Sequence, residues 1–281
     1  MNVHNIGLSD VEFTKLSSFI YANYGIKLPI TKKVLLQSRL QNRLRETNLS
    51  SFKEYCDYVL SHKDEGTEII HMIDVVSTNK TDFFREPAHF DFLQSTILPE
   101  CVNENPNKEI KIWSAACSSG EEIYTLAMLL NEFSDTKNKI NYSLLGTDIS
   151  TRVLEKAAMA IYSEDKITPI LLNLRKKYLL RNKNPEKKDV RIVPELRKKV
   201  RFQRLNLMDN KYNVPTDFDV IFCRNVLIYF DKATQEKVIN KLCNHIKPHG
   251  YLILGHSESI TGIIAPLKQV KPTIYVKTIT K

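Results

Sequence analysis

The sequence predicts an α/β protein: a doubly wound, mostly parallel sheet with a small inserted β subdomain, preceded by an all-α domain. The first observation is that residues 1–75 show apolar positions at three- and four-residue steps and no strand alternation. The second is that short apolar runs alternate with helical patterns from about residue 108. The third is a strongly basic interval, residues 165–199, that interrupts this alternation. A chain of 281 residues has room for two domains.

The helical pattern of residues 1–75 comes with helix-start signals. Ser9 precedes the first apolar run and Glu12 follows three residues later, as in a capping box. Ser50 or Ser51 is expected to cap another helix that runs through Val59. We therefore assign residues 1–75 to a helical domain and residues 76–107 to a linker that leads into a domain of residues 108–281.

Elements of the second domain follow in order. The sequence predicts strands at 110–113, 142–146, 200–202, 218–222, 251–254 and 274–276, and helices at 123–133, 153–160 and 232–246. A turn at 248–250 is expected to lead into the fifth strand, and a short strand is expected at 190–193 within the insert. Ligands of doubly wound sheets bind beyond the carboxyl ends of the strands, so the strand ends are where a site is expected.

Composition excludes several classes of protein. No apolar run approaches the roughly 18 residues of a membrane span, and the N-terminus lacks the apolar core of a signal peptide. The five cysteines form no Cys-x-x-Cys pair, which is typical of reduced thiols in the cytoplasm. The histidines and cysteines show no ligand spacing, so no metal site is expected.

Positive charge is concentrated in two segments. The net charge is +9, and residues 175–204 hold thirteen Lys or Arg against three Asp or Glu, so the rest of the chain is nearly neutral. Residues 27–45 contain six Lys or Arg and no acidic residue. Such faces attract nucleic acid, anionic lipid or an acidic protein, and composition does not choose among them.

A turn of small residues follows the first predicted strand. Residues 114–120 are small and allow backbone to approach a ligand closely, but Gly120 is their single glycine, so neither a dinucleotide-binding nor a phosphate-binding glycine loop is present. Glu121 and Glu122 then stand where a phosphate would need positive charge. They favour a cationic ligand group such as an amine or a sulfonium; alternatively, they only complement the start of the helix.

Polar residues also follow the next three strands. Asp148 stands where an acidic residue commonly binds ribose hydroxyls, although a helix cap is the alternative. The pairs Asn206–Leu207 and Asn225–Val226 each offer an amide and an apolar neighbour that suit an adenine ring. Each pair alone is readily explained as structural. Their occurrence at successive strand ends favours a ligand that contains a nucleoside.

Four motifs occur in order along the chain: NKTDFFRE at 79–86, WSAACSSGEE at 113–122, FCRNVLIYF at 222–230 and GHSES at 255–259. Together they resemble the CheR family of chemotaxis receptor glutamate O-methyltransferases, and the resemblance covers nearly the whole chain. It implies a class I S-adenosylmethionine-dependent methyltransferase fold, with S-adenosylhomocysteine as product and no metal. It also implies that the substrates are glutamates in the cytoplasmic helical region of bacterial chemoreceptors.

The resemblance assigns expected roles to individual residues. Asn79, Thr81 and Arg85 should face the methionine end of the cofactor, Glu121 or Glu122 its amino group, and Asp148 its ribose. Asn206, Leu207, Asn225 and Val226 should frame the adenine. Arg85 and Tyr229 are the candidate catalytic residues that steer the incoming carboxylate; alternatively, they serve only the cofactor or the core.

Receptor recognition is expected to use positive charge, because a surface that carries methylated glutamates is acidic. Lys32, Arg39 and Arg43 fall within about 40° of one another on a helix and form the candidate receptor-binding stripe. The basic segment 175–204 is the rival surface. Some family members bind a receptor C-terminal peptide on the inserted β subdomain through a glycine-bearing loop, but residues 181–188 here contain no glycine, which argues against such tethering.

Two other functions fit the sequence less well. A nucleic-acid methyltransferase would suit the charge, but the Asn/Asp-Pro-Pro-aromatic motif of amino-group methylation is absent after the fourth strand. A basic docking module without activity would not need the polar residues at the strand ends. We therefore expect a cytoplasmic monomeric enzyme that neither binds nucleic acid nor inserts into a membrane.

Overall fold

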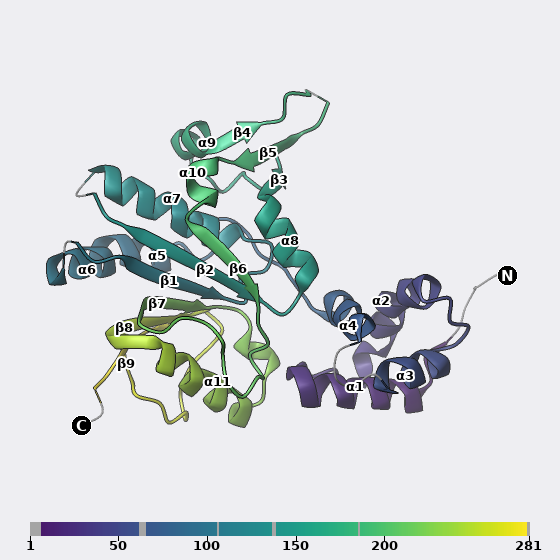
Figure 1. The fold of residues 1–281 in the computed structure, drawn as a ribbon. Coiled ribbons are helices and arrows are strands. Elements are labelled where there is room, and N and C mark those ends of the chain that lie inside the picture. Colours follow the sequence, from purple (N-terminus) through teal and green to yellow (C-terminus); the bar gives the residue numbers. More distant parts are fainter. Residues whose placement is uncertain (1–6, 62–65, 106, 137–138, 185, 280–281) are drawn as a thin grey trace.

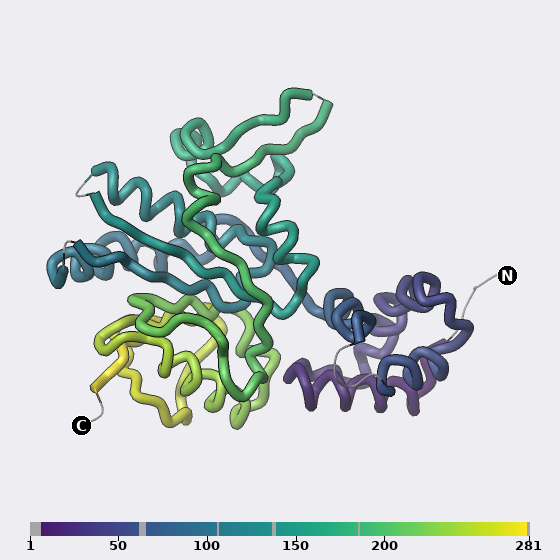
Figure 2. Tube along the Cα trace, in the orientation of Figure 1, coloured from purple at the N-terminus to yellow at the C-terminus, as the bar shows by residue number. Residues whose placement is uncertain are grey.

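The protein is described here by a computed structural model, which describes residues 7–61, 66–105, 107–136, 139–184 and 186–279 (Figure 1). A cluster of helices at the N-terminal end lies beside an α/β body. Figure 2 follows the chain from these helices through the last of them, α4 (Thr67–Val76), into the body. No helix in the described ranges is long and apolar enough to cross a membrane.

The N-terminal helices form a core of their own. They are α1 (Asp10–Tyr24), the 3-10 turn η1 (Ile30–Lys32), α2 (Lys33–Glu46), α3 (Phe52–Ser61) and α4. The apolar stripes predicted from the sequence are buried against one another, with Leu16, Ile20, Leu40 and Leu44 fully inaccessible to solvent. This arrangement confirms the all-α domain.

Local signals set the helix ends in this part of the chain. Ser9 and Glu12 form both hydrogen bonds of the predicted capping box at the start of α1. The Ser51 hydroxyl accepts the amide of Glu54 at 3.2 Å, so Ser51 is the predicted cap of α3. Gly25, in the left-handed conformation at φ 70°, ends α1.

The segment assigned to a linker contributes helices to the body. Residues 76–107 contain α5 (Ala88–Phe92), the π-helical turn η2 (Leu93–Ile97) and α6 (Leu98–Glu104). Phe90, Leu93 and Ile97 are buried in the same core as the sheet. These helices were not predicted from the sequence.

A seven-stranded sheet forms the centre of the body, in the order β6-β2-β1-β7-β8-β10-β9. Its strands are β1 (Ile110–Ala115), β2 (Tyr142–Asp148), β6 (Val200–Arg204), β7 (Phe218–Cys223), β8 (Ile246–Leu254), β9 (Leu267–Lys271) and β10 (Ile274–Lys277). The five strands from β6 to β8 are parallel, whereas β10 and β9 are antiparallel to their neighbours. The mostly parallel sheet is as predicted.

Helices cover both faces of this sheet. They include α7 (Glu121–Thr136), α8 (Thr151–Met159) and α11 (Lys232–His245) (Figure 1). Every residue of β7 is buried, because a parallel strand covered on both faces has no solvent side. Separate apolar clusters lie on the two faces of the sheet.

The C-terminal part of the sheet differs from the prediction in two respects. Residues 248–250, expected as a turn before the fifth strand, lie inside β8. Phe218 pairs with Ile246 while Val220 pairs with Tyr251, so extra residues of β8 bulge out between them. The edge strand β9 was not predicted, because LKQVK has only two apolar residues, three positions apart, and so lacks the alternation of a strand.

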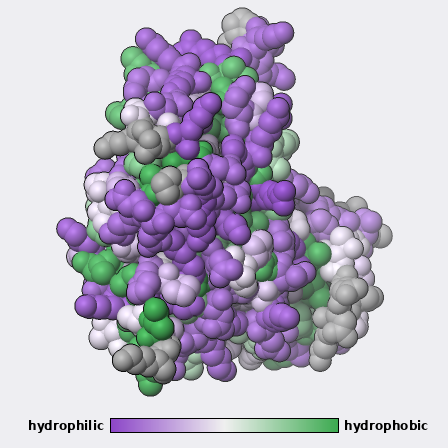
Figure 3. All heavy atoms as spheres, turned by 60° about the vertical axis from the view of Figure 1, so that its left-hand side comes forward, coloured by the Kyte–Doolittle hydropathy of each residue, from purple (hydrophilic) through white to green (hydrophobic). Residues whose placement is uncertain are grey.

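The inserted subdomain is a three-stranded antiparallel sheet that projects from the body. It contains β3 (Ile161–Ser163), α9 (Leu172–Tyr178), β4 (Leu179–Arg181), β5 (Asp189–Ile192) and α10 (Pro194–Arg197), with strand order β3-β5-β4. Its first strand precedes residue 165, so the insert begins slightly before the predicted bound. Figure 3 shows this projection, at the top, covered largely by hydrophilic side chains.

Candidate cofactor site

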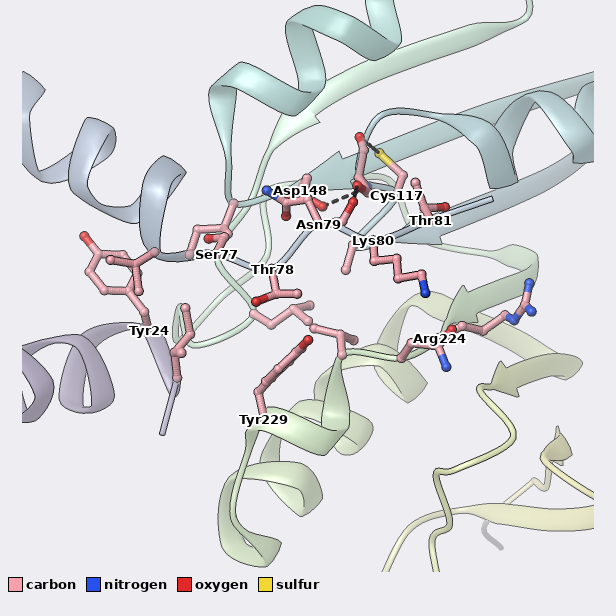
Figure 4. A pocket seen from close by; sticks show the side chains of 18 of the residues that line it. Tyr24, Ser77, Thr78, Asn79, Lys80, Thr81, Cys117, Asp148, Arg224 and Tyr229 are labelled. Atoms are coloured by element: carbon pink, nitrogen blue, oxygen red, sulfur yellow. Dashed lines mark hydrogen bonds between the residues drawn. The ribbon is translucent and has the colours of Figure 1, made fainter. Parts of the chain in front are cut away.

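A pocket lies between the N-terminal helices and the carboxyl ends of β1, β2, β6 and β7. It encloses about 1270 Å³ of empty space, counting the part that opens to solvent. Figure 4 shows Asp148 and Asn79 on one side of it and Tyr229 on the opposite side, with Tyr24 where the N-terminal helices border the pocket. Most residues that the sequence analysis proposed line it: Asn79, Thr81, Arg85, Glu122, Asp148, Asn206, Leu207, Asn225, Val226 and Tyr229.

The turn after β1 brings backbone to the pocket through unusual conformations. Ala116 and Ser118 both have positive φ, at 64° and 50°. Asn225, in the turn after β7, has φ 58°. Non-glycine residues pay of the order of 1 kcal/mol for such angles, and backbone strain of this kind concentrates at functional sites. The strained turns therefore support the assignment of this pocket as a ligand site.

Asp148 connects two turns at the end of β2. One carboxylate oxygen accepts the Ser118 amide at 2.9 Å and the other accepts the Ser150 amide at 3.0 Å. Burial raises the pKa of this carboxyl, and the backbone hydrogen bonds act against that rise. Ser150, not Asp148, caps α8 by accepting the Val153 amide. Each oxygen of Asp148 retains a lone pair for a ligand hydroxyl.

The structure separates the two neighbouring glutamates at the start of α7. Glu122 lines the pocket, whereas Glu121 is buried outside it and accepts the Ser119 hydroxyl at 2.7 Å. Burial raises the pKa of Glu121. Glu122 accepts the Ser114 hydroxyl at 2.7 Å and pairs with Arg224 at 2.9 Å. Of the two candidates for a ligand amino group, Glu122 is the one within the pocket.

Arg224, which the sequence analysis did not single out, joins three of the motifs. Its buried guanidinium pairs with Glu122 and with Glu86, each at 2.9 Å, and also donates to the carbonyl oxygen of Arg85. Its Nε atom has no hydrogen-bond partner among the described residues. A buried, unsatisfied donor on a pocket wall suits a ligand acceptor such as a carboxylate.

Asn206 and Asn225 reach the pocket, but protein contacts already use their side-chain amides. Asn206 donates to the carbonyl of Asn23 at 2.8 Å and accepts the Met208 amide at 3.0 Å. Asn225 donates to Glu86 at 3.3 Å. These amides therefore fix the shape of the pocket as well as facing it.

The NKTDFFRE segment crosses the pocket without regular secondary structure. The Ser118 hydroxyl donates to the carbonyl of Asn79 at 3.0 Å, and Arg85 donates to the carbonyl of Lys80 at 3.1 Å. The side chain of Arg85 remains about one third exposed. Before this segment, Ser77 caps the C-terminal end of α4, its amide and its hydroxyl both donating to the carbonyl of Ile73.

The N-terminal helices supply a wall that sequence reasoning missed. Tyr24, Lys27, Leu28, Lys32, Leu35 and Arg39 all line the pocket. The two parts are joined by the Asn206–Asn23 hydrogen bond, by Tyr21 hydrogen-bonded to Asp231, and by Thr151 donating to Asp74 at 2.9 Å. No local pattern in residues 24–39 indicates this contact, because it depends on how the helices dock.

The proposed receptor-binding stripe is partly engaged within the protein. Arg43 pairs with Glu68 at 2.5 Å and is largely buried. Arg39 is half-buried and donates to the carbonyls of Val76 and Ser77 at the end of α4. Lys32 is exposed at the rim of the pocket. Of the three side chains, Lys32 is therefore the most accessible to a partner.

A cluster of one glutamate and two histidines, not evident from the sequence, includes the residue next to Arg85 in the chain. Glu86, His89 and His256 place ligand-type atoms within 4.8 Å of one another. The Glu86 oxygen that faces His89 also binds Arg224, so a divalent cation there would lie beside a guanidinium. We assign no metal to this cluster. Burial and the charge of Arg224 lower the pKa of His89 to about 4, so this histidine is neutral at pH 7.

This donor set fits a ligand that combines a nucleoside with an amino acid. One pocket contains Asp148, whose carboxylate suits ribose hydroxyls, and Glu122, which lies beside the unsatisfied Nε donor of Arg224. The same pocket contains the apolar side chains of Leu207 and Val226, each next to an asparagine. The sequence also matches two family descriptions: "CheR methyltransferase, SAM binding domain" over residues 79–276 and "CheR methyltransferase, all-alpha domain" over residues 11–77.

The chain belongs to the CheR methyltransferase family. The family identified from the four motifs is thereby confirmed, and with it the class of fold.

Curated relatives named as chemotaxis protein methyltransferases match almost end to end. The Borreliella burgdorferi protein is 43% identical over 97% of this chain and 96% of its own length. The Salmonella typhimurium protein is 36% identical over 96% and 91%, and the Escherichia coli protein is 37% identical over 92% and 87%. The chain is thus a bacterial-type methyltransferase of chemotaxis that carries an S-adenosylmethionine-binding domain.

Proposed function

We propose that this protein transfers the methyl group of S-adenosylmethionine to glutamate side chains in the cytoplasmic helical region of bacterial chemoreceptors. The family supplies the methyltransferase reaction, the cofactor and the link to chemotaxis. The glutamate acceptor is the further step. The observation that carries it is the charge of the pocket, whose lining has six Lys or Arg against three Asp or Glu. This excess of positive charge favours an anionic acceptor.

A carboxylate acceptor also agrees with the groups that are present. No histidine occurs among the described residues that line the pocket. A glutamate has a pKa of about 4.3 and is ionised at pH 7, so it needs no base to become a nucleophile. S-adenosylmethionine, when bound, supplies a methyl group that its sulfonium has already activated. The protein then has to align the reactants and exclude water.

Individual residues are proposed to hold the cofactor and the acceptor. Asp148 would hold the ribose, Glu122 the amino group, and Leu207 and Val226 the faces of the adenine, with Asn206 and Asn225 at its edge. Asn79, Thr81 and Arg85 would contact the methionine end. Arg85 and Tyr229 both line the pocket and would steer the incoming carboxylate.

The receptor is proposed to dock on the N-terminal helices at the pocket rim. Lys27 and Lys32 are exposed there. Ile30 and Val34, close to them in sequence, are 56% and 77% exposed. A surface that mixes cations with apolar side chains fits an acidic amphipathic helix. Arg39 and Arg43 contribute charge to this face although their guanidinium groups have partners within the protein.

Several properties follow from this proposal. The enzyme would act in the cytoplasm as a monomer, on protein and not on nucleic acid. The hairpin between β4 and β5 lacks the glycine of tethering relatives, so a receptor C-terminal peptide is not proposed to bind there. The basic insert would instead contribute general attraction to acidic partners.

The test is methyl transfer from radiolabelled S-adenosylmethionine to purified receptor cytoplasmic fragments. Glutamate methyl esters release volatile methanol in mild base, whereas methylated amines do not. We expect base-labile label on wild-type fragments and none on matched fragments whose candidate glutamates are replaced by alanine. Base-stable label, or transfer to RNA or DNA in place of the fragments, would overturn the proposal.

A further inference from the structure

Glu258 is a buried carboxylate beneath the turn that ends β7. It follows β8 in the GHSES motif and is 6% exposed. One oxygen accepts the backbone amides of Asn225 at 2.8 Å and Gly255 at 2.7 Å. The other accepts the amide of Leu227 at 2.7 Å. A single side chain therefore connects the loop after β8 to the turn after β7.

The turn that Glu258 holds has little regular structure of its own. Asn225 is in the left-handed conformation, and the 3-10 turn η3 (Leu227–Tyr229) contains three residues. No side chain caps η3 from Val226, the residue in front of it. Without Glu258, the amides of Asn225 and Leu227 would lose their hydrogen-bond acceptor, and an unsatisfied buried donor destabilises the turn that carries it.

The same turn presents several side chains to the pocket. Asn225, Val226 and Tyr229 all line it. Because the turn is short, the two amides that Glu258 binds determine where these side chains point. A shift of a few tenths of an ångström in the turn would therefore move both the proposed adenine contacts and the proposed carboxylate-steering hydroxyl.

Close packing shows that the loop after β8 is fitted to this turn. A Cβ atom added to Gly255 would lie 2.5 Å from the Asn225 side-chain nitrogen and 2.9 Å from the Glu258 carboxylate. No real Cβ makes such contacts, so any other residue at 255 would displace the turn or the carboxylate. Gly255 and Glu258 thus act on the same turn from one side.

If Glu258 only filled space in the core, a neutral side chain at this position would be sufficient. Glu258 forms no ion pair with Lys, Arg or His among the described residues, and an unpaired buried carboxylate is costly. Three backbone donors offset this cost, since a charged acceptor makes stronger hydrogen bonds than a neutral one. The carboxylate holds the turn more rigidly than an amide would.

We propose that Glu258 is a positioning residue for methyl transfer, fixing the Asn225–Tyr229 turn so that cofactor and acceptor are aligned. This inference rests on the proposed function, because it assigns Asn225, Val226 and Tyr229 to that reaction. Glu258 itself touches neither reactant; it acts through the backbone of the turn.

The test compares Glu258→Gln and Glu258→Asp with the wild type. Glutamine has one acceptor oxygen and turns an amide group toward a backbone donor, so we expect S-adenosylhomocysteine to bind at least tenfold more weakly by calorimetry. The turnover number at saturating cofactor and receptor fragment should also fall at least tenfold. Aspartate keeps both acceptor oxygens and should restore part of each loss.

Glu236→Gln is the matched control. Its carboxylate also accepts a backbone amide, that of Ile264 at 3.2 Å, but neither Glu236 nor Ile264 is among the residues that line the pocket. This variant should bind and turn over like the wild type. If Glu258→Gln does not fold, Gly255→Ala disturbs the same turn and should show the same combined loss of affinity and turnover, in a protein that still unfolds cooperatively.

The outcomes separate this inference from the proposed function. If the wild type itself does not bind S-adenosylhomocysteine or modify receptors, the proposed function fails. If the wild type does both, and Glu258→Gln and Gly255→Ala lose thermal stability but keep affinity and turnover, Glu258 is only a structural residue and the inference is wrong.

Discussion

Asp148 serves both the fold and the pocket at the level of a single side chain. It holds the Ser118 and Ser150 amides and also faces the site. Asp148→Ala is expected to weaken S-adenosylhomocysteine binding at least tenfold, because a hydrogen bond to a charged group is worth about 1.5–3 kcal/mol. Calorimetry well below the melting temperature of the variant measures this directly. An unchanged dissociation constant would remove Asp148 from the site.

His89 should make stability depend on pH. Burial and Arg224 lower its pKa to about 4 from 6.5, so between these values the unfolded chain binds a proton that the folded chain does not. Stability from this residue is complete above pH 6.5 and is lost as pH falls toward 4, by at most about 3 kcal/mol.

The measurement for His89 is urea unfolding at several pH values in this window. His89→Gln can keep a donor near Thr273, whose hydroxyl lies 2.8 Å from His89 Nε2. The variant should lose stability less steeply with falling pH than the wild type. Parallel curves for the two proteins would show that another group accounts for the pH dependence.

The stretch from η1 into α2 is the element on which receptor recognition is predicted to depend. Lys32→Glu places a negative charge at the rim of the pocket and should lower methylation of receptor fragments at least fivefold, more at low salt, where charges are least screened. The affinity for S-adenosylhomocysteine should change much less. Arg45→Glu, an exposed cation near the end of α2 and outside the pocket lining, is the matched control and should have little effect.

The basic insert is the alternative surface for receptor recognition, and variants of it can contradict the prediction for Lys32. Charge reversal of Lys187, Lys188 and Arg191 acts on the hairpin and its strand β5, which lie outside the pocket lining. If this triple variant loses receptor methylation while Lys32→Glu keeps it, the N-terminal helices are not the recognition element. Arg39 and Arg43 are less suitable for charge reversal than Lys32, because the guanidinium of Arg43 pairs with the buried carboxylate of Glu68.

At the scale of the whole molecule, the docked N-terminal helices form one wall of the pocket. Gly25 marks the contact: an added Cβ would lie 2.4 Å from the Phe230 ring, and φ is 70°. Gly25→Ala should separate the two parts slightly and weaken S-adenosylhomocysteine binding at least fivefold. Gly262→Ala is the matched control, because its φ is 73° but its added Cβ meets nothing within 4 Å.

Calorimetry on the two glycine variants distinguishes an effect of backbone strain from an effect of displacing the N-terminal helices. Both carry the backbone cost of a left-handed alanine, about 1 kcal/mol. Only Gly25→Ala should lose affinity. Equal affinities for the two variants would mean that the N-terminal wall contributes nothing to cofactor binding.

The sequence by itself determined the elements whose signals are local. The apolar periods at Leu40 and Leu44, the capping box at Ser9 and the buried strands such as β7 all follow from near neighbours, and the structure confirms them. Polar residues at strand ends could also be gathered into one site, because parallel strands place their carboxyl ends at one edge. The order of the motifs identified the family.

Tertiary structure decided what depends on contacts between distant segments. The choice between Glu121 and Glu122 depends on which of them faces the pocket, and the partner of Arg43 lies 25 residues away at Glu68. The bridge from Glu258 to Asn225 and the wall formed by the N-terminal helices have no local pattern. Hydrogen bonding and packing across such separations depend on how whole elements dock, which no short stretch of sequence specifies.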